Sequence, residues 1–351
     1  MEHRASTMVS WLPLFRPAGA LTAGADVAAG WAVAGSGDGP GDWLAGATLV
    51  LASVCLYAGG VALNDVCDAA EDARLRAERP IPSGAISRKH AALLAAAFLI
   101  LGVALAFATG ASQLAPEPVT TQQPIAWTTF APGYVALALV AAIVLYNAVL
   151  KRCALVGPFS MGACRGLNLI LGMSVGAGAV ALWWPLALGH VAHIAGVTAM
   201  ARHETDKPES PASSDRDTPG TPHPSPLPMG EGVGRIARRL SEHRMAVGMA
   251  ILLSCLTLVG WAVLAFLSSL INTLWLMVFL ALFGASVFPS MLAAWRSPSP
   301  PVVRRAVGQG VLGLIMLDAA IAAGFASPVY GLAVLCLWPM SCGLGRRFAI
   351  S

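Results

Sequence analysis

The chain has 351 residues, of which 56% are hydrophobic and only 11% are charged. A soluble globular domain carries about 25% charged residues, so this composition excludes an ordinary soluble fold. With a mean hydropathy of +0.69, the sequence predicts an all-α, polytopic integral membrane protein. The formal net charge of +4 requires no nucleic acid as a partner, because the topology described below accounts for the basic residues.

Apolar segments long enough to cross about 30 Å of hydrocarbon recur along the whole chain. The first is the least hydrophobic, and the last two are separated only by Ser327-Pro328, so they can form one broken element. We therefore predict a membrane helical bundle of nine to ten transmembrane helices. The segments lie near residues 17–35, 42–63, 90–110, 131–150, 155–178, 181–201, 245–267, 271–293, 306–325 and 327–345.

The lysine and arginine residues occur in every second loop between these segments. They are absent from the loops at 36–41, 111–130, 179–182 and 268–270. Because short cytoplasmic loops retain basic residues, the N-terminus is predicted to be cytoplasmic. We expect the protein in a bacterial inner (cell) membrane, in contact with membrane lipid.

An acidic cluster directly follows the second apolar segment. On a helix, Asn64, Asp68 and Asp72 fall on one stripe, and Asp65 joins it three residues before Asp68. Carboxylates crowded at a membrane boundary repel one another unless a cation lies among them. Mg²⁺, bound by a few carboxylates and by substrate phosphate oxygens, suits this pattern. A solvated, amphipathic helix end is the alternative.

Two basic elements accompany the acids. Residues 79–84, Arg-Pro-Ile-Pro-Ser-Gly, predict a stiff turn that can aim the Arg79 guanidinium at a phosphate. Lys151 and Arg152 follow the fourth apolar segment, where they could also be simple membrane-interface anchors. Acids that hold Mg²⁺, with basic groups converging on them, predict a diphosphate site.

These motifs resemble those of the UbiA superfamily of intramembrane prenyltransferases. Asn-Asp-x-x-Asp-x-x-x-Asp at 64–72, the 79–84 loop and Tyr-Asn-x-x-Leu-Lys-Arg at 146–152 occur in the family's order. The resemblance implies one UbiA-type transmembrane domain over residues 1–345, with a central cavity open to the cytoplasmic side. It also implies Mg²⁺-dependent transfer of an isoprenyl group from a polyprenyl diphosphate to a hydrophobic or aromatic acceptor within the membrane.

The resemblance assigns roles residue by residue. The first Mg²⁺ would be held by Asn64, Asp65 and Asp68, with Asp72 in support. We expect Asp68, Lys151 and Arg152 to be catalytic, the two basic residues by neutralising the leaving diphosphate. The substrate would also contact Arg79, and the cavity mouth would be lined by Tyr146 and Asn147.

The fifth and sixth segments add polar residues within the membrane. Arg165 and Asn168 share one helical face, and an intramembrane arginine is expected to face a polar cavity and its substrate. A salt bridge from Arg165 to Asp26 or Asp318 is the alternative. For His193, a role as general base beside the substrate competes with an interhelical hydrogen bond.

The family's second aspartate motif is altered in this chain. Where the family carries a second pair of acids after its sixth helix, residues 198–206 supply Glu204 and Asp206, beside Arg202. We expect the two acids to bind a second Mg²⁺ if the helix ends there, and Arg202 to bind substrate. Residues 207–234 are rich in Pro and Ser and predict a disordered cytoplasmic loop insertion.

This departure resembles the UbiA-like EboC branch of the superfamily. The alternative function is therefore a catalytically weak or inactive relative that binds or exports an isoprenoid or a secondary metabolite. A secondary transporter that uses Asp26, Asp318 and Arg165 as intramembrane charges is a further alternative. No inverted repeat supports the transporter.

Overall fold

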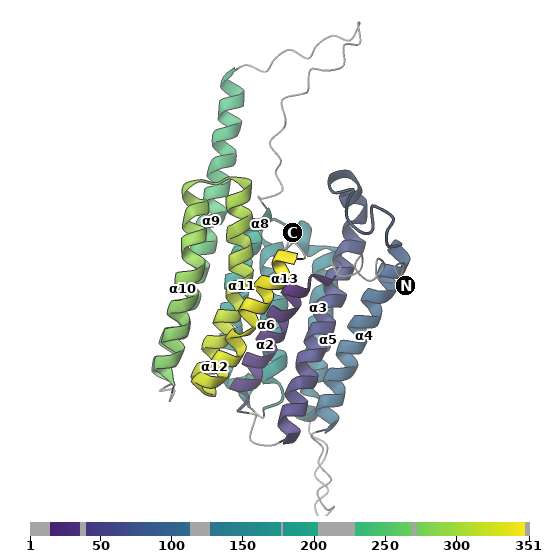
Figure 1. The fold of residues 1–351 in the computed structure, drawn as a ribbon, viewed down its shortest axis with the longest axis vertical. Helices are drawn as coiled ribbons and strands as arrows, with labels where there is room; N and C mark the ends of the chain where they lie inside the picture. Colours follow the sequence, from purple (N-terminus) through teal and green to yellow (C-terminus); the bar gives the residue numbers. More distant parts are fainter. Residues whose placement is uncertain are drawn as a thin grey trace, which may run out of the picture.

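The computed structural model describes residues 15–35, 40–112, 127–176, 178–202, 229–268 and 272–347, and these form helices and turns without a strand (Figure 1). The prediction of an all-α fold is confirmed. The long helices are α2 (Pro17–Val33), α3 (Pro40–Leu75), α4 (Arg88–Ser112), α5 (Ala131–Ala148), α6 (Val156–Met173), α8 (Pro185–Arg202), α9 (Met229–Leu267), α10 (Thr273–Arg296) and α11 (Pro300–Phe325). The short ones are η1 (Trp127–Phe130), η2 (Leu150–Arg152), α7 (Ala179–Trp183), α12 (Pro328–Leu335) and α13 (Leu337–Arg347).

The interruption of the helix that is predicted near Ser327-Pro328 separates α11 from α12. Pro328 lies in the first turn of α12, where the missing N–H of proline removes no helical hydrogen bond. The Ser327 side chain caps the same helix by accepting a hydrogen bond from the Tyr330 N–H at 3.2 Å. A further break between α12 and α13 leaves the last predicted segment as two short helices.

Seven described segments are long and apolar enough to cross a membrane, and they belong to α3, α4, α5, α9, α10, α11 and the α12–α13 pair. The other predicted spans, α2, α6 and α8, have 17 or 18 residues and carry polar groups. They pack among the longer helices, so an apolar face toward lipid is not required of them. The count of nine to ten transmembrane helices remains a prediction.

The helices α2 and α8 carry buried polar side chains, Thr22 and Asp26 on α2 and His190 and His193 on α8. α2 packs against α3, α6 and α11, and α8 packs against α6, α9 and α11. α4 lies at one edge of the molecule and α10 at the other (Figure 1). Large apolar side chains are exposed on these outer helices, which suits contact with lipid. They include Leu93 and Ile100 on α4 and Leu274 and Val278 on α10, and α9 likewise exposes Leu252, Leu256 and Val259.

The crossing of α2 and α6 depends on two glycines. A Cβ at Gly30 would lie 2.1 Å from the Leu169 carbonyl oxygen, and one at Gly172 would lie 2.2 Å from the Val27 carbonyl oxygen. The two backbones are therefore in direct contact, as in other small-residue crossings within membranes. This close approach brings polar side chains of α2 and α6 together in the interior.

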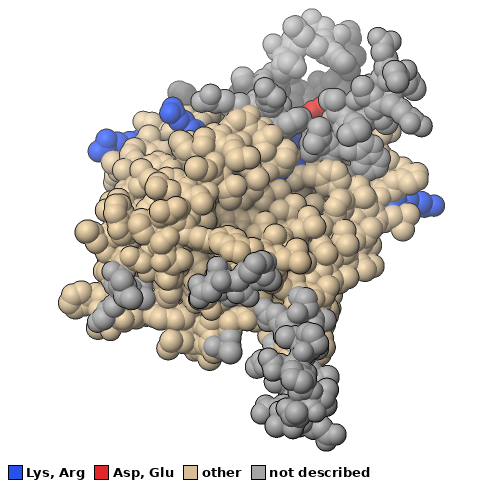
Figure 2. All heavy atoms as spheres, turned by 60° about the horizontal axis from the view of Figure 1, so that its bottom comes forward, with Lys and Arg blue, Asp and Glu red and all other residues tan. Residues whose placement is uncertain are grey.

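The two ends of the bundle differ in charge. The acidic cluster and most basic residues of the described helices lie at the end where α3 and α8 finish, which is the top of Figure 1. Figure 2 brings the opposite end forward, and the residues drawn in colour there are almost all uncharged. This separation agrees with the alternation of basic loops in the sequence.

Candidate functional site

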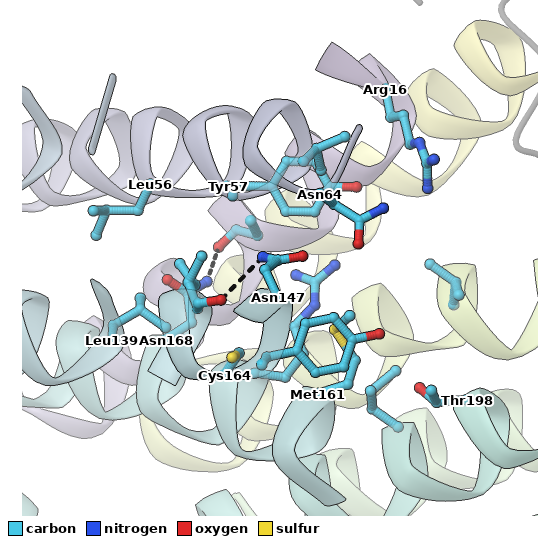
Figure 3. A pocket seen from close by; sticks show the side chains of 18 of the residues that line it. Arg16, Leu56, Tyr57, Asn64, Leu139, Asn147, Met161, Cys164, Asn168 and Thr198 are labelled. Carbon is cyan, nitrogen blue, oxygen red and sulfur yellow. Dashed lines mark hydrogen bonds between the residues drawn. The ribbon is translucent and has the colours of Figure 1, made fainter. Parts of the chain in front are cut away.

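A cavity lies between α2, α3, α5, α6, α8 and α11 and has two adjoining parts. Figure 3 shows side chains that line the inner part. An inner chamber of about 320 Å³ is reached from an outer mouth of about 1130 Å³ at the charged end of the bundle. Both parts are lined by Arg16, Tyr57, Asn64, Tyr146, Thr198, Ala201, Val307 and Val311. The mouth and the chamber therefore form one continuous space.

The walls of the two parts have different chemistry. The chamber is mainly apolar and is lined by residues such as Leu56, Val61, Leu139, Ile143, Met161, Ile194 and Val197. Many of the residues that line the mouth are charged, namely Arg16, Asp68, Glu71, Arg76, Glu78, Arg79, Lys151, Arg152, Arg202 and Arg304. Such a space suits a molecule with a charged head and an apolar tail.

The acidic cluster of α3 is divided between two surroundings. Asn64 and Asp68 line the mouth together with Glu71. Asp65 and Asp72 are buried, with 8% and 5% of their surface exposed, and do not line it. A helix turns about 100° per residue around its axis. Asp72 comes seven residues after Asp65, so the two side chains leave the helix within about 20° of the same direction. Asp72 comes eight residues after Asn64, so these two directions differ by about 80°. The single stripe expected from the sequence is therefore wrong for Asp72.

The two buried acids hold the 79–84 loop. The Arg79 Nη1 donates to Asp72 Oδ2 at 2.8 Å and lies 3.8 Å from Asp65 Oδ1. Arg16 Nη2 lies 3.6 Å from the same Asp65 oxygen. Gly84 has a φ of +78°, which allows the loop to turn back, and the buried Ile86 anchors it on α3 and α4. The loop thus presents Arg79 at the mouth, as predicted for a phosphate-binding arginine.

Lys151 and Arg152 lie in η2, the short turn after α5, and both line the mouth. The Lys151 Nζ is in direct contact with Asp68 Oδ1 and donates to Asn64 Oδ1 at 3.4 Å. A cationic group therefore already lies at the oxygens predicted to bind Mg²⁺.

Arg202, at the end of α8, fixes the same turn. Its Nη1 donates to the Lys151 and Cys153 carbonyl oxygens at 3.0 and 2.8 Å, and its Nη2 to that of Arg152 at 3.4 Å. Arg202 also lines the mouth. The guanidinium thus supports the basic turn in addition to any contact with substrate.

Tyr146 lines both parts of the cavity. Asn147, which is labelled in Figure 3, lines the chamber and not the mouth. Asn147 is buried and its Nδ2 donates to the Ile143 carbonyl oxygen at 2.9 Å. Its Oδ1 has no hydrogen-bond partner in the part of the chain that the structure describes. The chamber therefore contains a free acceptor group in an otherwise apolar wall.

Arg165 and Asn168 line the chamber and also contact Asp26 on α2. The Arg165 Nη1 and the Asn168 Nδ2 each donate to Asp26 Oδ2 at 3.0 Å. The Arg165 Nη2 donates to Thr22 Oγ1 at 2.6 Å, and the guanidinium lies 5.3 Å from the centre of the Tyr57 ring. The salt-bridge alternative for Arg165 is thus realised with Asp26, while the residue still faces the cavity.

His193 does not line either part of the cavity. It is fully buried, with Nδ1 2.9 Å from Ser254 Oγ and Nε2 2.8 Å from the Gly310 carbonyl oxygen. Both ring nitrogens are therefore occupied by α9 and α11. This arrangement is the interhelical alternative and contradicts the predicted contact with substrate.

The second predicted metal pair, Glu204 and Asp206, lies outside the described residues, as do residues 207–228 of the predicted loop. α9 already begins at Met229, within the end of that loop. In the described part of α8 the mouth is lined by Thr198, Ala201 and Arg202, and this helix contains no carboxylate.

Sequence reasoning missed several residues of the cavity. Arg16, Tyr57 and Arg304 line the mouth but were given no role in substrate binding. Tyr57 had a signal in the sequence, because seven residues separate it from Asn64 and both therefore lie on one face of α3. Arg16 precedes α2 and Arg304 lies in α11, so packing of the helices rather than local spacing brings them to the mouth.

A sequence profile of the UbiA prenyltransferase family matches residues 27–307. The chain belongs to this family, and its apolar helices make it an integral membrane protein. The digeranylgeranylglyceryl phosphate synthase of Methanopyrus kandleri is 40% identical over 99 residues, which are 28% of this chain and 35% of that protein. The enzyme of the same name from Methanosarcina barkeri is 32% identical over 138 residues, or 39% and 41% of the two chains. The matches thus span less than half of either relative.

Solved structures share the fold over most of the chain. A UbiA homolog from Archaeoglobus fulgidus, bound to DMAPP and Mg²⁺, has a TM-score of 0.56 and 17% identity, and the match covers 93% of this chain and 99% of that one. The same homolog with GPP and Mg²⁺ has a TM-score of 0.53 and 16% identity, with the same coverage. At these identities the likeness establishes the fold alone.

Proposed function

We propose that the protein is a prenyltransferase that uses Mg²⁺ to transfer an isoprenyl group from a polyprenyl diphosphate to a hydrophobic or aromatic acceptor within the membrane. The observation that carries this proposal is the charged mouth that continues into an apolar chamber. Membership in the UbiA family supports it, as do the solved homologs that bind DMAPP or GPP with Mg²⁺.

The mouth has suitable ligands for Mg²⁺. Asn64, Asp68 and Glu71 present oxygen atoms from one face of α3, and Mg²⁺ prefers such hard donors together with phosphate oxygens and water. Lys151 contacts Asn64 Oδ1 and Asp68 Oδ1, which indicates that these two oxygens favour a cation. We assign Asn64 and Asp68 to the metal, which would supply positive charge to the diphosphate. Asp65 and Asp72 act through Arg79.

The basic residues of the mouth stabilise the departing diphosphate. Breaking the allylic carbon–oxygen bond concentrates negative charge on the leaving group. Fixed cations that face this charge stabilise the transition state more than the ground state. Arg79, Lys151 and Arg152 supply them from two sides of the mouth. The ties from Asp72 to Arg79 and from Arg202 to η2 keep these cations in place.

The chamber binds the apolar part of the reaction. Its aliphatic wall accommodates isoprenyl units and keeps water from the electron-deficient carbon that forms when the diphosphate leaves. The Asn147 Oδ1 lacks a protein partner and can accept a hydrogen bond from a hydroxyl or amine of the acceptor. Asn147 would thereby orient the acceptor toward the new bond, after which the proton that the acceptor loses passes to the released diphosphate or to water at the mouth.

The decisive experiment uses the full-length protein in detergent, labelled prenyl diphosphates of several lengths, Mg²⁺ and a panel of acceptors. We expect release of diphosphate and formation of a prenylated product. Since removing one group that stabilises transition-state charge costs about 100-fold or more in rate, Asp68→Ala and Lys151→Met should each lose at least that factor.

Lys89→Met is the matched control for Lys151→Met, because Lys89 is exposed at the start of α4 and does not line the cavity. It should retain the rate of the unmodified protein. Tight, Mg²⁺-dependent binding of prenyl diphosphate without turnover of any acceptor would overturn the proposal in favour of an isoprenoid-binding protein.

A further inference from the structure

A second cluster of metal-ligating residues lies behind the chamber wall. Asp26 of α2, His190 of α8 and Asp318 of α11 are all fully buried, and one ligand atom from each lies within 4.8 Å of the other two. The His190 Nε2 is 2.8 Å from Asp318 Oδ1 and 3.7 Å from Asp26 Oδ1. None of the three lines the mouth or the chamber.

Two oxygens of this cluster lack partners. Asp26 Oδ1 and Asp318 Oδ2 are buried, and neither accepts a hydrogen bond from a donor among the described residues. Leaving a carboxylate oxygen unpaired is unfavourable in any protein interior, and more so at membrane depth. Asp26 Oδ1 faces His190 at the centre of the cluster, so the geometry indicates a missing positive group between the two carboxylates.

We propose that Asp26, His190 and Asp318 bind one divalent transition-metal ion, at a site distinct from that of the Mg²⁺ in the mouth. Two carboxylates and one imidazole form a donor set that suits ions such as Mn²⁺, Fe²⁺ or Zn²⁺. Ligand bonds of about 2.1 Å place neighbouring ligand atoms about 3.4 Å apart around a tetrahedral ion. The observed separations of 2.8 and 3.7 Å lie on either side of that value.

The surroundings of Asp26 resemble the outer shell of a metal site. Its second oxygen, Oδ2, accepts hydrogen bonds from Arg165 and Asn168. Carboxylates that bind metals are usually oriented by such bonds. The two positive charges of the ion would neutralise the two carboxylates. The remaining charge would be that of Arg165, whose side chain is 11% exposed at the chamber wall. The ion would also join α2, α8 and α11, which form much of the cavity wall.

A single proton shared by the two carboxylates is the competing arrangement. With a proton the cluster needs no ion, because Arg165 and one protonated group balance both acids. Only the metal site contains a transition-metal ion, and only there is an imidazole nitrogen bound to a metal. Both differences can be measured.

The test uses full-length protein purified without chelator. Elemental analysis by mass spectrometry should find about one transition-metal ion per chain. After treatment with a chelator, Mn²⁺ is added and pulsed EPR is recorded. A bound imidazole produces nitrogen-14 modulation, whereas the mouth offers oxygen ligands from Asn64 and Asp68. We expect this modulation in the unmodified protein and its loss in His190→Gln and in Asp318→Asn.

Two variants serve as controls. His193→Gln changes a buried histidine one turn from His190 that is bonded to Ser254 and Gly310, so the modulation should remain. Asp68→Asn removes a ligand of the mouth and should also leave the modulation intact. Protein without transition metal that gives no nitrogen-14 modulation after Mn²⁺ addition overturns the proposal, as does a protonated-carboxyl infrared band that Asp318→Asn abolishes. Because the metal content and the nitrogen-14 modulation are read from the unmodified protein, unfolding of a variant does not affect the first of these two outcomes.

Discussion

Asp72 affects the mouth without lining it. Its carboxylate, 5% exposed, accepts a hydrogen bond from Arg79 at 2.8 Å, and no other described acid lies as close to that guanidinium. The sequence motif gave Asp72 a supporting role at Mg²⁺, whereas the structure points to a role in holding an arginine. The two roles predict different effects of mutation.

We expect Asp72→Asn to raise the KM for prenyl diphosphate about as much as Arg79→Gln does, because either change releases the guanidinium. A hydrogen bond between charged groups contributes about 1.5–3 kcal/mol, which corresponds to about 10- to 100-fold. The double variant should lose little more than either single variant, since all three lack the same contact. Initial rates at several substrate concentrations give these constants.

Binding of Mg²⁺ in the presence of a non-hydrolysable prenyl diphosphate analogue separates the two roles. If Asp72 were a metal ligand, Asp72→Asn would raise the Mg²⁺ concentration required for binding and Arg79→Gln would not. Glu242→Gln is the control, because Glu242 lies on α9 and lines neither part of the cavity. It should leave the KM unchanged.

The crossing of α2 and α6 determines whether the chamber keeps its shape. Gly172→Ala would bring a methyl group to 2.2 Å from the Val27 carbonyl oxygen, which the backbone can relieve only by separating the helices. We expect a loss of stability of about 1–3 kcal/mol, as for other overpacked interiors. Thermal unfolding in detergent, followed by intrinsic fluorescence, measures it.

Gly260→Ala is the control for this change. Gly260 lies in α9, and no atom is within 4 Å of a Cβ built there. Alanine favours a helix over glycine by up to about 1 kcal/mol, so this variant should melt at the same temperature as the unmodified protein or higher. Equal melting temperatures for the two alanine variants would show that the crossing tolerates separation.

Much of the fold was predictable from hydropathy, because long apolar helices at the lipid boundary leave a strong signal. The limits of α4, α5 and α10 are close to their predicted segments. The short inner helices gave a weaker signal, since burial among other helices relaxes the need for an apolar face. Periodicity alone also did not predict the break between α12 and α13.

The site was predictable where local sequence determines it and less so where packing does. Asn64, Asp68, Lys151 and Arg152 lie at the mouth as expected, because a motif and its loop set their positions. The partners of His190 and His193 come from α9 and α11, at least 61 residues further along the chain. A single sequence, read without an alignment to its relatives, contains no signal for contacts between residues so far apart in the chain.

The charged residues of the described helices gather mainly at one end of the bundle, and we predict that this end faces the cytoplasm. Cys153 is exposed beside Arg152 at the mouth. In a variant that retains only this cysteine, a membrane-impermeant maleimide should react after the cell membrane is opened and not in intact cells. Mass spectrometry of the purified protein measures the fraction labelled.

Ser268→Cys in the same background is the control, because Ser268 is exposed after the last turn of α9, at the opposite end of the bundle. It should be labelled in intact cells. The reverse pattern would place the mouth outside the cell and contradict the topology inferred from the basic loops.

The central position of α2 has a consequence for how the protein is made. Its 17 residues span only about 26 Å, less than the roughly 30 Å of a hydrocarbon layer, and it carries Asp26 at membrane depth. Its partners α6, α11 and α13 are synthesised later, and Ser341 near the chain's end donates a hydrogen bond to the Ala18 carbonyl oxygen at 2.7 Å. α2 thus leaves the ribosome well before these partners are made, and biogenesis requires a nascent chain that tolerates this delay.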